Sequence, residues 1–155
     1  MPALATIGYE GTTIGAVLNT LLEADVGLLI DVRAVPQSRK PGFSKRQLAA
    51  ALDEAGIAYV HLQGLGTPKP GRDAVRAGHP ERMEVIFRDH MNSDRAQVDL
   101  ARARQLAEAG ARDRSRPRPA CLLCFERDHN TCHRRLVAEM IVADTRQTVV
   151  HLAVP

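Results

Sequence analysis

Short apolar segments alternate along the chain with amphipathic segments of helical periodicity. Residues 4–8 and 28–32 are apolar runs of strand length, and the second carries a single acid, Asp31. Continuous apolar runs are typical of strands that are covered on both faces, which favours a parallel sheet. Further strands are predicted at residues 57–62, 120–125 and 148–152.

Helices are predicted between these strands. A first helix should follow a cap at Thr12 or Thr13. Ser44 and Gln47 have the spacing of a capping box before a second helix. Residues 64–78 contain four glycines and two prolines, which indicates a long exposed loop. The other helices are predicted at residues 80–91 and 94–109 and directly after residue 131.

This alternation predicts a single α/β domain over residues 1–155, with a mostly parallel sheet of about five strands and helices on both faces. A chain of 155 residues can bury its core without a disulfide or a structural metal. No apolar run is long enough to cross a bilayer, and the first residues do not resemble a signal peptide. Three cysteines, an odd number, favour reduced thiols in the cytoplasm. Strand order and oligomeric state do not follow from the sequence.

Charge is unevenly placed in a chain whose formal net charge is +3. Arginines alternate with other residues at positions 112, 114, 116 and 118. A basic surface can bind nucleic acid, but the chain has no Trp and only 3% aromatic residues, so stacking platforms for bases are scarce. We therefore interpret the arginine run as a solvated linker and favour a small anionic ligand over a nucleic-acid partner.

Polar side chains gather where the predicted strands end. In an open parallel sheet these carboxyl ends share one edge, and ligands bind there. The strand-end candidates for ligand binding or catalysis are Tyr9, Glu10, Asp31, Arg33, Ser38, Arg39, His61, Cys124 and Glu126. Cys132, His133 and Arg134 join them from the start of the following helix.

Cys132 is the candidate with the most chemistry around it. The first turn of a helix and the neighbouring cationic side chains lower the pKa of a thiol. Cys132 could then act as a nucleophile, with Glu126 or His133 handling the proton and His61 as a further acid–base candidate. Asp31 would orient an arginine. The same arrangement also suits phosphate binding without chemistry at the thiol, and a third alternative is simple helix packing.

A metal or redox site is the alternative to thiol catalysis. Cys124, His129, Cys132 and His133 are enough donors for zinc, but the seven-residue gap between the two cysteines is not a zinc-finger spacing. Because Cys132 and His133 are adjacent in the sequence, we expect that their side chains would not easily reach the same ion, so no metal site is assigned. Cys124 and Cys132 could instead form a reversible disulfide. Cys121 is expected in the core.

Four sequence blocks together resemble the signature of the domain-of-unknown-function 488 family. They are residues 6–10 (TIGYE), residues 31–43 with Asp31, Arg33, Pro36, Ser38, Arg39 and Phe43, residues 59–66 with His61 and Gly66, and the pair Cys124-Phe-Glu126 and Cys132-His133-Arg134. The resemblance implies a small α/β domain in a bacterial or archaeal cytoplasm, with these blocks forming one site, and it implies no established reaction. One departure is Gln63-Gly64, where a Pro-Glu-like pair is expected.

The leading hypothesis is a cytoplasmic enzyme that binds a phosphorylated or otherwise anionic small molecule, such as a nucleotide. Arg33, Arg39 and Arg134 would bind the anion, because planar guanidinium groups hold oxyanions in a bidentate manner. The alternative hypothesis is a redox- or metal-sensing binding module that uses Cys124 and Cys132, with a basic surface for a protein or nucleic-acid partner. The residues identify no cofactor.

Overall fold

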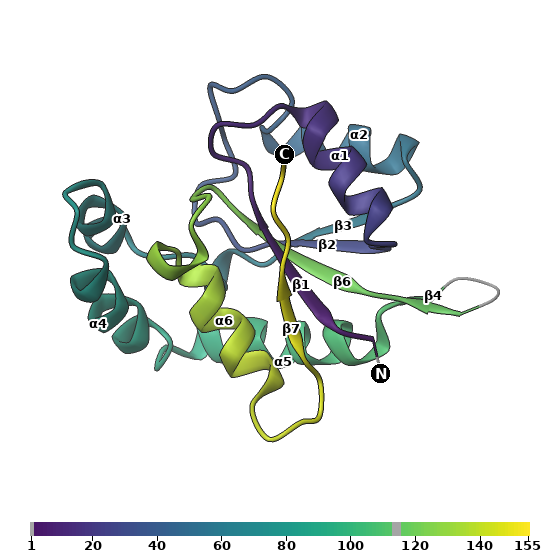
Figure 1. Ribbon diagram of the computed structural model, residues 1–155. Helices are drawn as coiled ribbons and strands as arrows, with labels where there is room; N and C mark the ends of the chain where they lie inside the picture. Colours follow the sequence, from purple (N-terminus) through teal and green to yellow (C-terminus); the bar gives the residue numbers. More distant parts are fainter. Residues whose placement is uncertain (1, 113–115) are drawn as a thin grey trace.

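A five-stranded, all-parallel sheet with helices on both faces forms the centre of the molecule (Figure 1). This computed structural model describes residues 2–112 and 116–155. The strand order is β3-β2-β6-β1-β7. The strands are β1 (Leu4–Gly8), β2 (Leu28–Asp31), β3 (Ala58–His61), β6 (Ala120–Cys124) and β7 (Val149–His151). The predicted α/β class and parallel sheet are therefore confirmed.

The helices follow the strands in the order that the apolar periodicity predicts. They are α1 (Ile14–Glu23), α2 (Lys45–Glu54), α3 (Lys69–Arg76), α4 (Pro80–His90), α5 (Asp94–Ala109) and α6 (His133–Val142). Two short 3₁₀ segments, η1 (Gln63–Leu65) and η2 (His129–Thr131), precede α3 and α6. No helix in the described ranges combines the length and the apolar character that a membrane crossing requires.

Alternating side chains of each strand pack into two separate cores. In β6, Leu122 and Cys124 face the core that is completed by α4, α5 and α6. Cys121 and Leu123 face the opposite core, which α1 and α2 complete, and both are fully buried. Helices α1 and α2 lie on one side of the sheet in Figure 1, with α5 and α6 on the other. The prediction that Cys121 belongs to the core is confirmed.

Of two predicted helix caps, one forms its side-chain hydrogen bond and the other does not. Thr13 caps α1 as expected, since its hydroxyl accepts a hydrogen bond from the Ala16 backbone. Ser44 precedes α2 but makes no capping bond with its side chain. Its hydroxyl instead exchanges hydrogen bonds with the backbone of Ser38, which ties the loop after β2 back onto the start of α2.

The expectation of a long loop over residues 64–78 was wrong, because this segment contains helix α3. Its prolines and glycines lie where a helix accepts them. Pro70 falls in the first turn, and Gly78 adopts a positive φ of 83° just after the helix. Gly71 gives room for packing, since a Cβ there would lie 2.4 Å from the Thr67 methyl carbon. Helix α3 packs against α4 at the margin of the molecule (Figure 1).

The arginine run is more ordered than a solvated linker. Short strands β4 (Ala111–Arg112) and β5 (Pro117–Arg118) form an antiparallel pair. Arg118 donates to the Val26 carbonyl at 2.8 Å, and Arg116 pairs with Asp25 at 2.6 Å. Arg114 lies outside the described residues. The described part of this segment therefore packs against the turn before β2.

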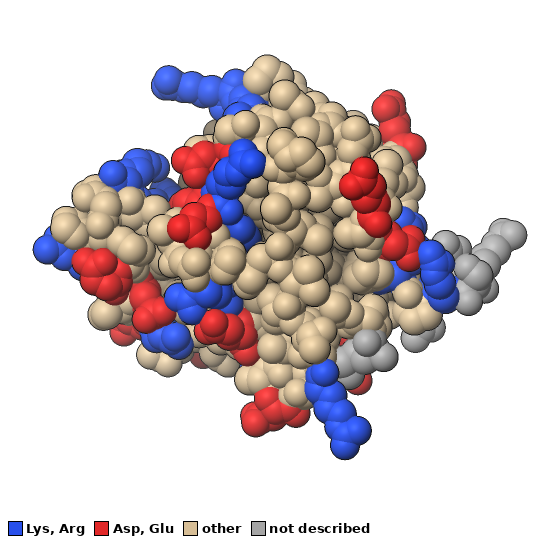
Figure 2. All heavy atoms as spheres, in the orientation of Figure 1, with Lys and Arg blue, Asp and Glu red and all other residues tan. Residues whose placement is uncertain are grey.

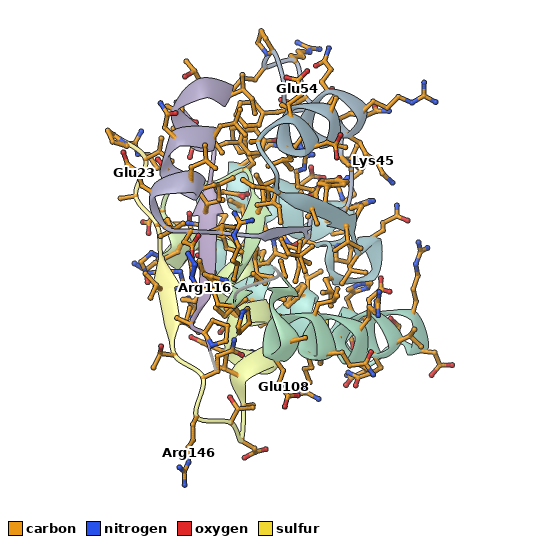
Figure 3. All side chains as sticks on the ribbon, turned by 90° about the vertical axis from the view of Figure 1, so that its right-hand side faces the viewer. Glu23, Lys45, Glu54, Glu108, Arg116 and Arg146 are labelled. Atoms are coloured by element: carbon orange, nitrogen blue, oxygen red, sulfur yellow. The ribbon has the colours of Figure 1, made fainter. Side chains whose placement is uncertain are left out.

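The surface carries both signs of charge. Figure 2 shows acidic and basic side chains interspersed over the face drawn there, with no continuous basic area. Exposed side chains such as Glu54 and Arg146, both labelled in Figure 3, lie at the periphery of the molecule. This face therefore lacks the broad positive surface that non-specific nucleic-acid binding requires.

Candidate functional site

The carboxyl ends of the central strands meet beside a cavity of about 820 Å³. The parallel register pairs Gly8 with Cys124 and Asp31 with His61. The residues that follow these ends therefore converge on one edge, as the strand pattern predicts. On this side the cavity wall includes Tyr9, Glu10, Arg33, Ser38, Cys124, Phe125, Glu126 and His133.

Arg33 is the centre of a buried network at the end of β2. Its Nε and Nη2 donate to the two carboxylate oxygens of Asp31 at 2.9 and 2.8 Å. Its Nη1 donates to the Tyr9 hydroxyl at 3.1 Å and to the Phe43 carbonyl at 2.7 Å. Tyr59 also donates to Asp31, at 2.6 Å. Every nitrogen of this guanidinium donates a hydrogen bond to a protein atom, so the network connects four chain segments.

Burial and a neighbouring carboxylate govern the electrostatics of this network. Burial raises the pKa of Tyr59 above its ordinary value, and the hydrogen bond to Asp31 raises it further. Burial alone would lower the pKa of Arg33, but its bonds to Asp31 more than offset this effect and raise it. Asp31 therefore orients Arg33 and keeps it charged.

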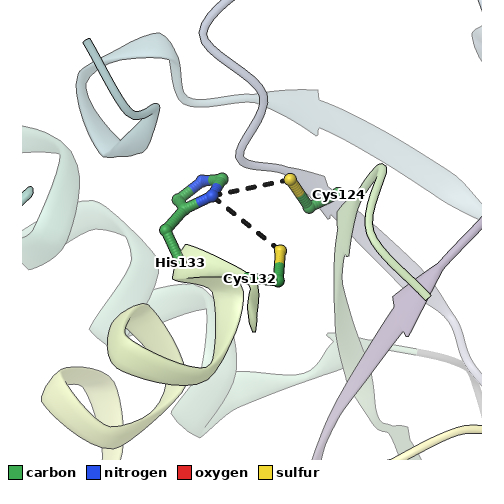
Figure 4. Close-up of side chains that lie close together, drawn as sticks. All are labelled: Cys124, Cys132 and His133. Atoms are coloured by element: carbon green, nitrogen blue, oxygen red, sulfur yellow. Dashed lines mark hydrogen bonds between the residues drawn. The ribbon is translucent and has the colours of Figure 1, made fainter. Parts of the chain in front are cut away.

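Cys124, Cys132 and His133 form a buried cluster where β6 ends and α6 begins. The Cys124 sulfur lies 3.5 Å and the Cys132 sulfur 3.9 Å from His133 Nδ1 (Figure 4). His133 Nε2 lies 2.8 Å from the Val32 carbonyl, which can only accept, so Nε2 carries hydrogen. This bond fixes the ring with Nδ1 directed at the two sulfurs. Glu126 Oε2 completes the cluster at 3.4 Å from Cys124 Sγ and 3.3 Å from Cys132 Sγ.

The cluster separates charge between its members. Burial raises the pKa of Cys132, but hydrogen bonds from Cys124 and His133 and the nearby positive charge outweigh it and hold the pKa well below that of an ordinary thiol. The bond to Cys132, together with burial, raises the pKa of Cys124. Burial lowers the pKa of His133, but its contact with Cys132 raises it more. These shifts favour the thiolate form of Cys132, the thiol form of Cys124 and the protonated form of His133.

Glu126 is the carboxyl group of the cluster. Burial and the negative charge at Cys132 raise its pKa to about 7. A carboxyl group with this pKa exchanges its proton near neutral pH, which suits general acid–base chemistry. In its protonated form it donates to the neighbouring sulfur.

Cys132 does not itself reach the cavity. It is the N-cap of α6 rather than a residue of the first turn, and it is 1% exposed. Among the described residues the cavity wall includes Cys124, Glu126 and His133 but not Cys132. The second sulfur thus lies directly behind the first.

Arg134 belongs to the framework and not to the cavity wall. Its Nε donates to Thr6 Oγ1 at 3.1 Å, Nη1 donates to the Glu126 carbonyl, and Nη2 donates to the Arg127 carbonyl at 3.2 Å. It is 1% exposed. Gly8 leaves room for this loop, since a Cβ there would lie 1.9 Å from the Glu126 carbonyl oxygen. Arg134 therefore positions the backbone that carries Glu126.

Of the remaining predicted site residues, some line the cavity and others lie outside its wall. Glu10 and Ser38 line the cavity, and Glu10 accepts a hydrogen bond from the Arg127 backbone at 3.1 Å. His61 Nε2 lies 2.7 Å from the Arg33 carbonyl and supports that residue from outside the wall. Arg39 is exposed in the loop after β2 and is also outside the wall as far as the structure describes it.

Helix α3 contributes a wall that the sequence reasoning missed. Thr67, Arg72 and Arg76 line the cavity from this side. The spacing of four residues between the two arginines could have suggested one face of a helix. That signal was hidden because Pro and Gly marked the segment as a loop.

The ligand atoms of the cluster lie close enough together for one metal ion, although adjacent Cys132 and His133 were expected to face one only with difficulty. Ligand atoms of Cys124, Cys132 and His133 lie within 4.8 Å of one another. Tetrahedral zinc with bonds of about 2.3 Å to sulfur and 2.0 Å to nitrogen needs ligand separations of roughly 3.5–3.8 Å. The observed sulfur–nitrogen distances of 3.5 and 3.9 Å are close to these. The Val32 carbonyl supplies the outer hydrogen bond that metal-binding histidines use.

Comparison with known proteins gives a family and no activity. Neither the curated proteins nor the solved structures yield a match to this chain. A family model described as "Domain of unknown function DUF488" matches residues 13–141. That range contains α1 to α5, all of α6 except its last residue, and every member of the thiol cluster. The chain belongs to the DUF488 family.

Proposed function

We propose that the protein is a thiol-dependent enzyme that acts on a small phosphorylated or otherwise anionic molecule held in the cavity. The observation that carries this proposal is that Cys124, Glu126 and His133 line the same cavity wall. Cys132 lies just outside this wall and is hydrogen-bonded to Glu126 and His133. A stabilised thiolate, an imidazolium and a carboxyl group that titrates near neutral pH supply a nucleophile and an acid–base group. Buried reduced thiols of this kind suit a cytoplasmic protein.

The chemistry assigned to the cluster is group transfer to water. A sulfur of the Cys124–Cys132 pair forms a bond to the electrophilic centre of the substrate while the bond to the leaving group breaks. The leaving group keeps the electron pair and takes the proton of Glu126. Water then attacks the intermediate and gives a proton back to Glu126, and the sulfur leaves as thiolate. His133 stabilises the thiolate before and after the reaction.

The cavity fits a ligand of nucleotide size. Its volume of about 820 Å³ lies within the usual range of roughly 300–1,000 Å³ for small-molecule sites. Phe125 lies on its wall and is 43% exposed, which is unusual for a large aromatic side chain in this protein. Tyr9 supports Phe125 edge-on at 5.4 Å between ring centroids. A planar ring of the ligand can stack on this aromatic surface.

The test is the pH dependence of alkylation at each cysteine. The full-length protein reacts with iodoacetamide between pH 5 and 9, with and without millimolar phosphate, and peptide mass spectrometry quantifies each site. We expect a cluster cysteine to react with an apparent pKa below the ~8.5 of a free thiol, and phosphate to slow the reaction. Cys132→Ser should remove this low-pH reactivity.

Cys121→Ser is the matched control, because Cys121 is buried in the opposite core and lies outside the cluster. It should leave the alkylation profile of the cluster unchanged. The proposal is wrong if no cluster cysteine reacts below pH 8.5, or if phosphate leaves the rates unchanged.

A second candidate function is metal or redox sensing by the same cluster. The close approach of three ligand atoms within 4.8 Å favours it. One equivalent of zinc retained through dialysis, and lost in Cys132→Ser but not in Cys121→Ser, would support a sensing module. A Cys124–Cys132 disulfide after mild peroxide treatment would support its redox form. Absence of both leaves thiol catalysis as the function of the cluster.

A further inference from the structure

The cavity has a second polar wall, on helix α3, opposite the sheet edge. Arg72 and Arg76 lie one helical turn apart, so both face the same side of α3, and both line the cavity. Val75 and Met83 form apolar wall beside them. This wall comes from the α3–α4 pair, and the thiol cluster comes from β6 and α6.

The two arginines on α3 have guanidinium groups that are only partly used by the protein. Arg72 donates from Nη1 to the Thr67 carbonyl at 2.8 Å, and Arg76 donates from Nη1 to Asp73 at 3.2 Å. Among the described residues, their Nε and Nη2 groups have no acceptor, and Arg72 forms no ion pair within 4 Å. This leaves N–H groups free to bind an oxyanion, which guanidinium groups do in a bidentate manner.

Thr67 adds a buried polar atom to the same wall. It is 4% exposed, and its Oγ1 has no hydrogen-bond partner in the part of the chain that the structure describes. A buried hydroxyl without a partner is unfavourable, so such atoms are few in native proteins and each calls for an explanation. Arg72 donates to the carbonyl of the same residue, so this unpaired hydroxyl lies close to one of the two cations.

The opposite wall carries the carboxyl groups of Glu10 and Glu126 beside Arg33 and His133. An anionic group would be repelled by a carboxylate there and attracted to α3. The two walls of the cavity therefore differ in charge: the described lining residues of the α3 wall include arginines and no carboxylate, whereas the sheet edge carries both signs. This polarity orients a ligand that carries its negative charge at one end.

We propose that Arg72 and Arg76, with Thr67 beside them, form the oxyanion subsite of the cavity and bind the phosphoryl group of the ligand. This assignment rests on the proposed function and deepens it, because it places the reacting part of the substrate at the cluster and the phosphoryl group at α3. Arg33, Arg39 and Arg134, the arginines that the sequence suggested for the anion, are not part of this subsite.

A pair of alkylating agents of similar size and different charge tests the subsite. Iodoacetate is anionic and iodoacetamide is neutral, so the ratio of their rates at a cluster cysteine reports attraction of the anion into the cavity. We expect Arg72→Gln combined with Arg76→Gln to lower this ratio about tenfold, as the loss of a charge-assisted hydrogen bond implies.

The control is Arg82→Gln combined with Arg88→Gln. Both residues are exposed on α4, outside the cavity wall, and their replacement removes the same net charge. The control should change the ratio less than twofold. An equal fall in both double variants would show only long-range attraction and would overturn the subsite, as would an unchanged ratio in the α3 variant.

A second measurement does not depend on a reactive thiol. Inorganic phosphate and adenosine monophosphate should each raise the thermal midpoint of the wild-type protein and of the α4 control, but not of the α3 variant. If the cysteines are inert and the phosphate effect remains specific to α3, the proposed enzyme fails and the subsite stands. If the cysteines react as proposed, with protection by phosphate, and phosphate stabilises the α3 variant as much as the wild type, the subsite fails alone.

Discussion

Two pairs of arginines in this molecule have opposite surroundings. Arg33 and Arg134 are almost fully buried, and every side-chain nitrogen of each donates to protein. Arg72 and Arg76 line the cavity, and most of their N–H groups have no protein acceptor among the described residues. The first pair therefore joins chain segments, and the second pair is available to a ligand. An arginine beside a cavity is not by that position a ligand-binding residue.

Removing Arg33 should have the largest effect on stability. Arg33→Met leaves Asp31 buried without its charged partner, and breaking a buried pair in this way costs about 3–5 kcal/mol. Urea unfolding of the variant and of wild type measures this difference. Arg39→Met, an exposed arginine of the same loop, should change stability by less than about 0.5 kcal/mol. Equal stability of Arg33→Met and wild type would contradict the framework role.

Removing Arg134 should cost less, about 2 kcal/mol. The carbonyl groups of Glu126 and Arg127 would lose their donor, but both lie in a loop that water can partly reach. Because the same loop holds Glu126, the pH at which the cluster is alkylated should also shift in Arg134→Met. A loss of stability with an unchanged alkylation profile would separate this arginine from the site.

His151 is linked to Arg134 through the Thr6 hydroxyl and gives a pH-dependent test of the framework. The Thr6 hydroxyl accepts from Arg134 and lies 2.5 Å from His151 Nδ1. Burial, stacked His129 and Arg134 lower the pKa of His151 to about 4. The unfolded chain therefore binds the proton more readily between pH 6.5 and 4, and folding stability falls as the pH falls through this range.

The variant His151→Asn should lack the contribution that protonation of His151 makes to the pH dependence of folding stability. Its stability should fall less than that of wild type between pH 6.5 and 4, by on the order of 1 kcal/mol, because solvent screens a partly exposed ring. Parallel curves for the two proteins over this range would show that His151 titrates normally. Unfolding curves at half-unit pH steps provide the comparison.

The smallest effect on stability is expected for the cavity arginines. Arg72→Gln combined with Arg76→Gln should change the free energy of unfolding by less than about 0.5 kcal/mol, since both groups are at least partly exposed. The same variant is the one expected to lose anion capture. A large loss of stability would place these arginines with Arg33, and the contrast between the two pairs would then fail.

The elements that the sequence predicted correctly depend on local pattern. The apolar run of β1 and the span of α5 follow from periodicity and from capping, and the parallel sheet brings their ends to one edge. That edge brought Cys124, Glu126 and His133 together, as expected. Helix α3 was missed because Pro70 and Gly78 were taken for loop residues rather than for a helix start and end.

The rest of the site depends on contacts between distant segments. The acceptors that saturate Arg33 include the Phe43 carbonyl and the Tyr9 hydroxyl, which no local spacing could connect to it. The orientation of the His133 ring depends on a bond to Val32, 101 positions earlier in the chain. For this reason the sequence could suggest the members of the cluster but not their distances, and it underestimated the capacity of Cys132 and His133 to face one ion.

Helix α3 packs on α4 at the rim of the fold, while the thiol cluster lies where β6 ends and α6 begins. If the proposed function holds, the part of the protein that selects the ligand is separate from the part that reacts with it. Substitutions on the cavity-facing side of α3 could then admit sugars, amines or larger acids without changing the thiol cluster. A library of α3 sequences on this scaffold would therefore explore changes of substrate at nearly constant folding stability.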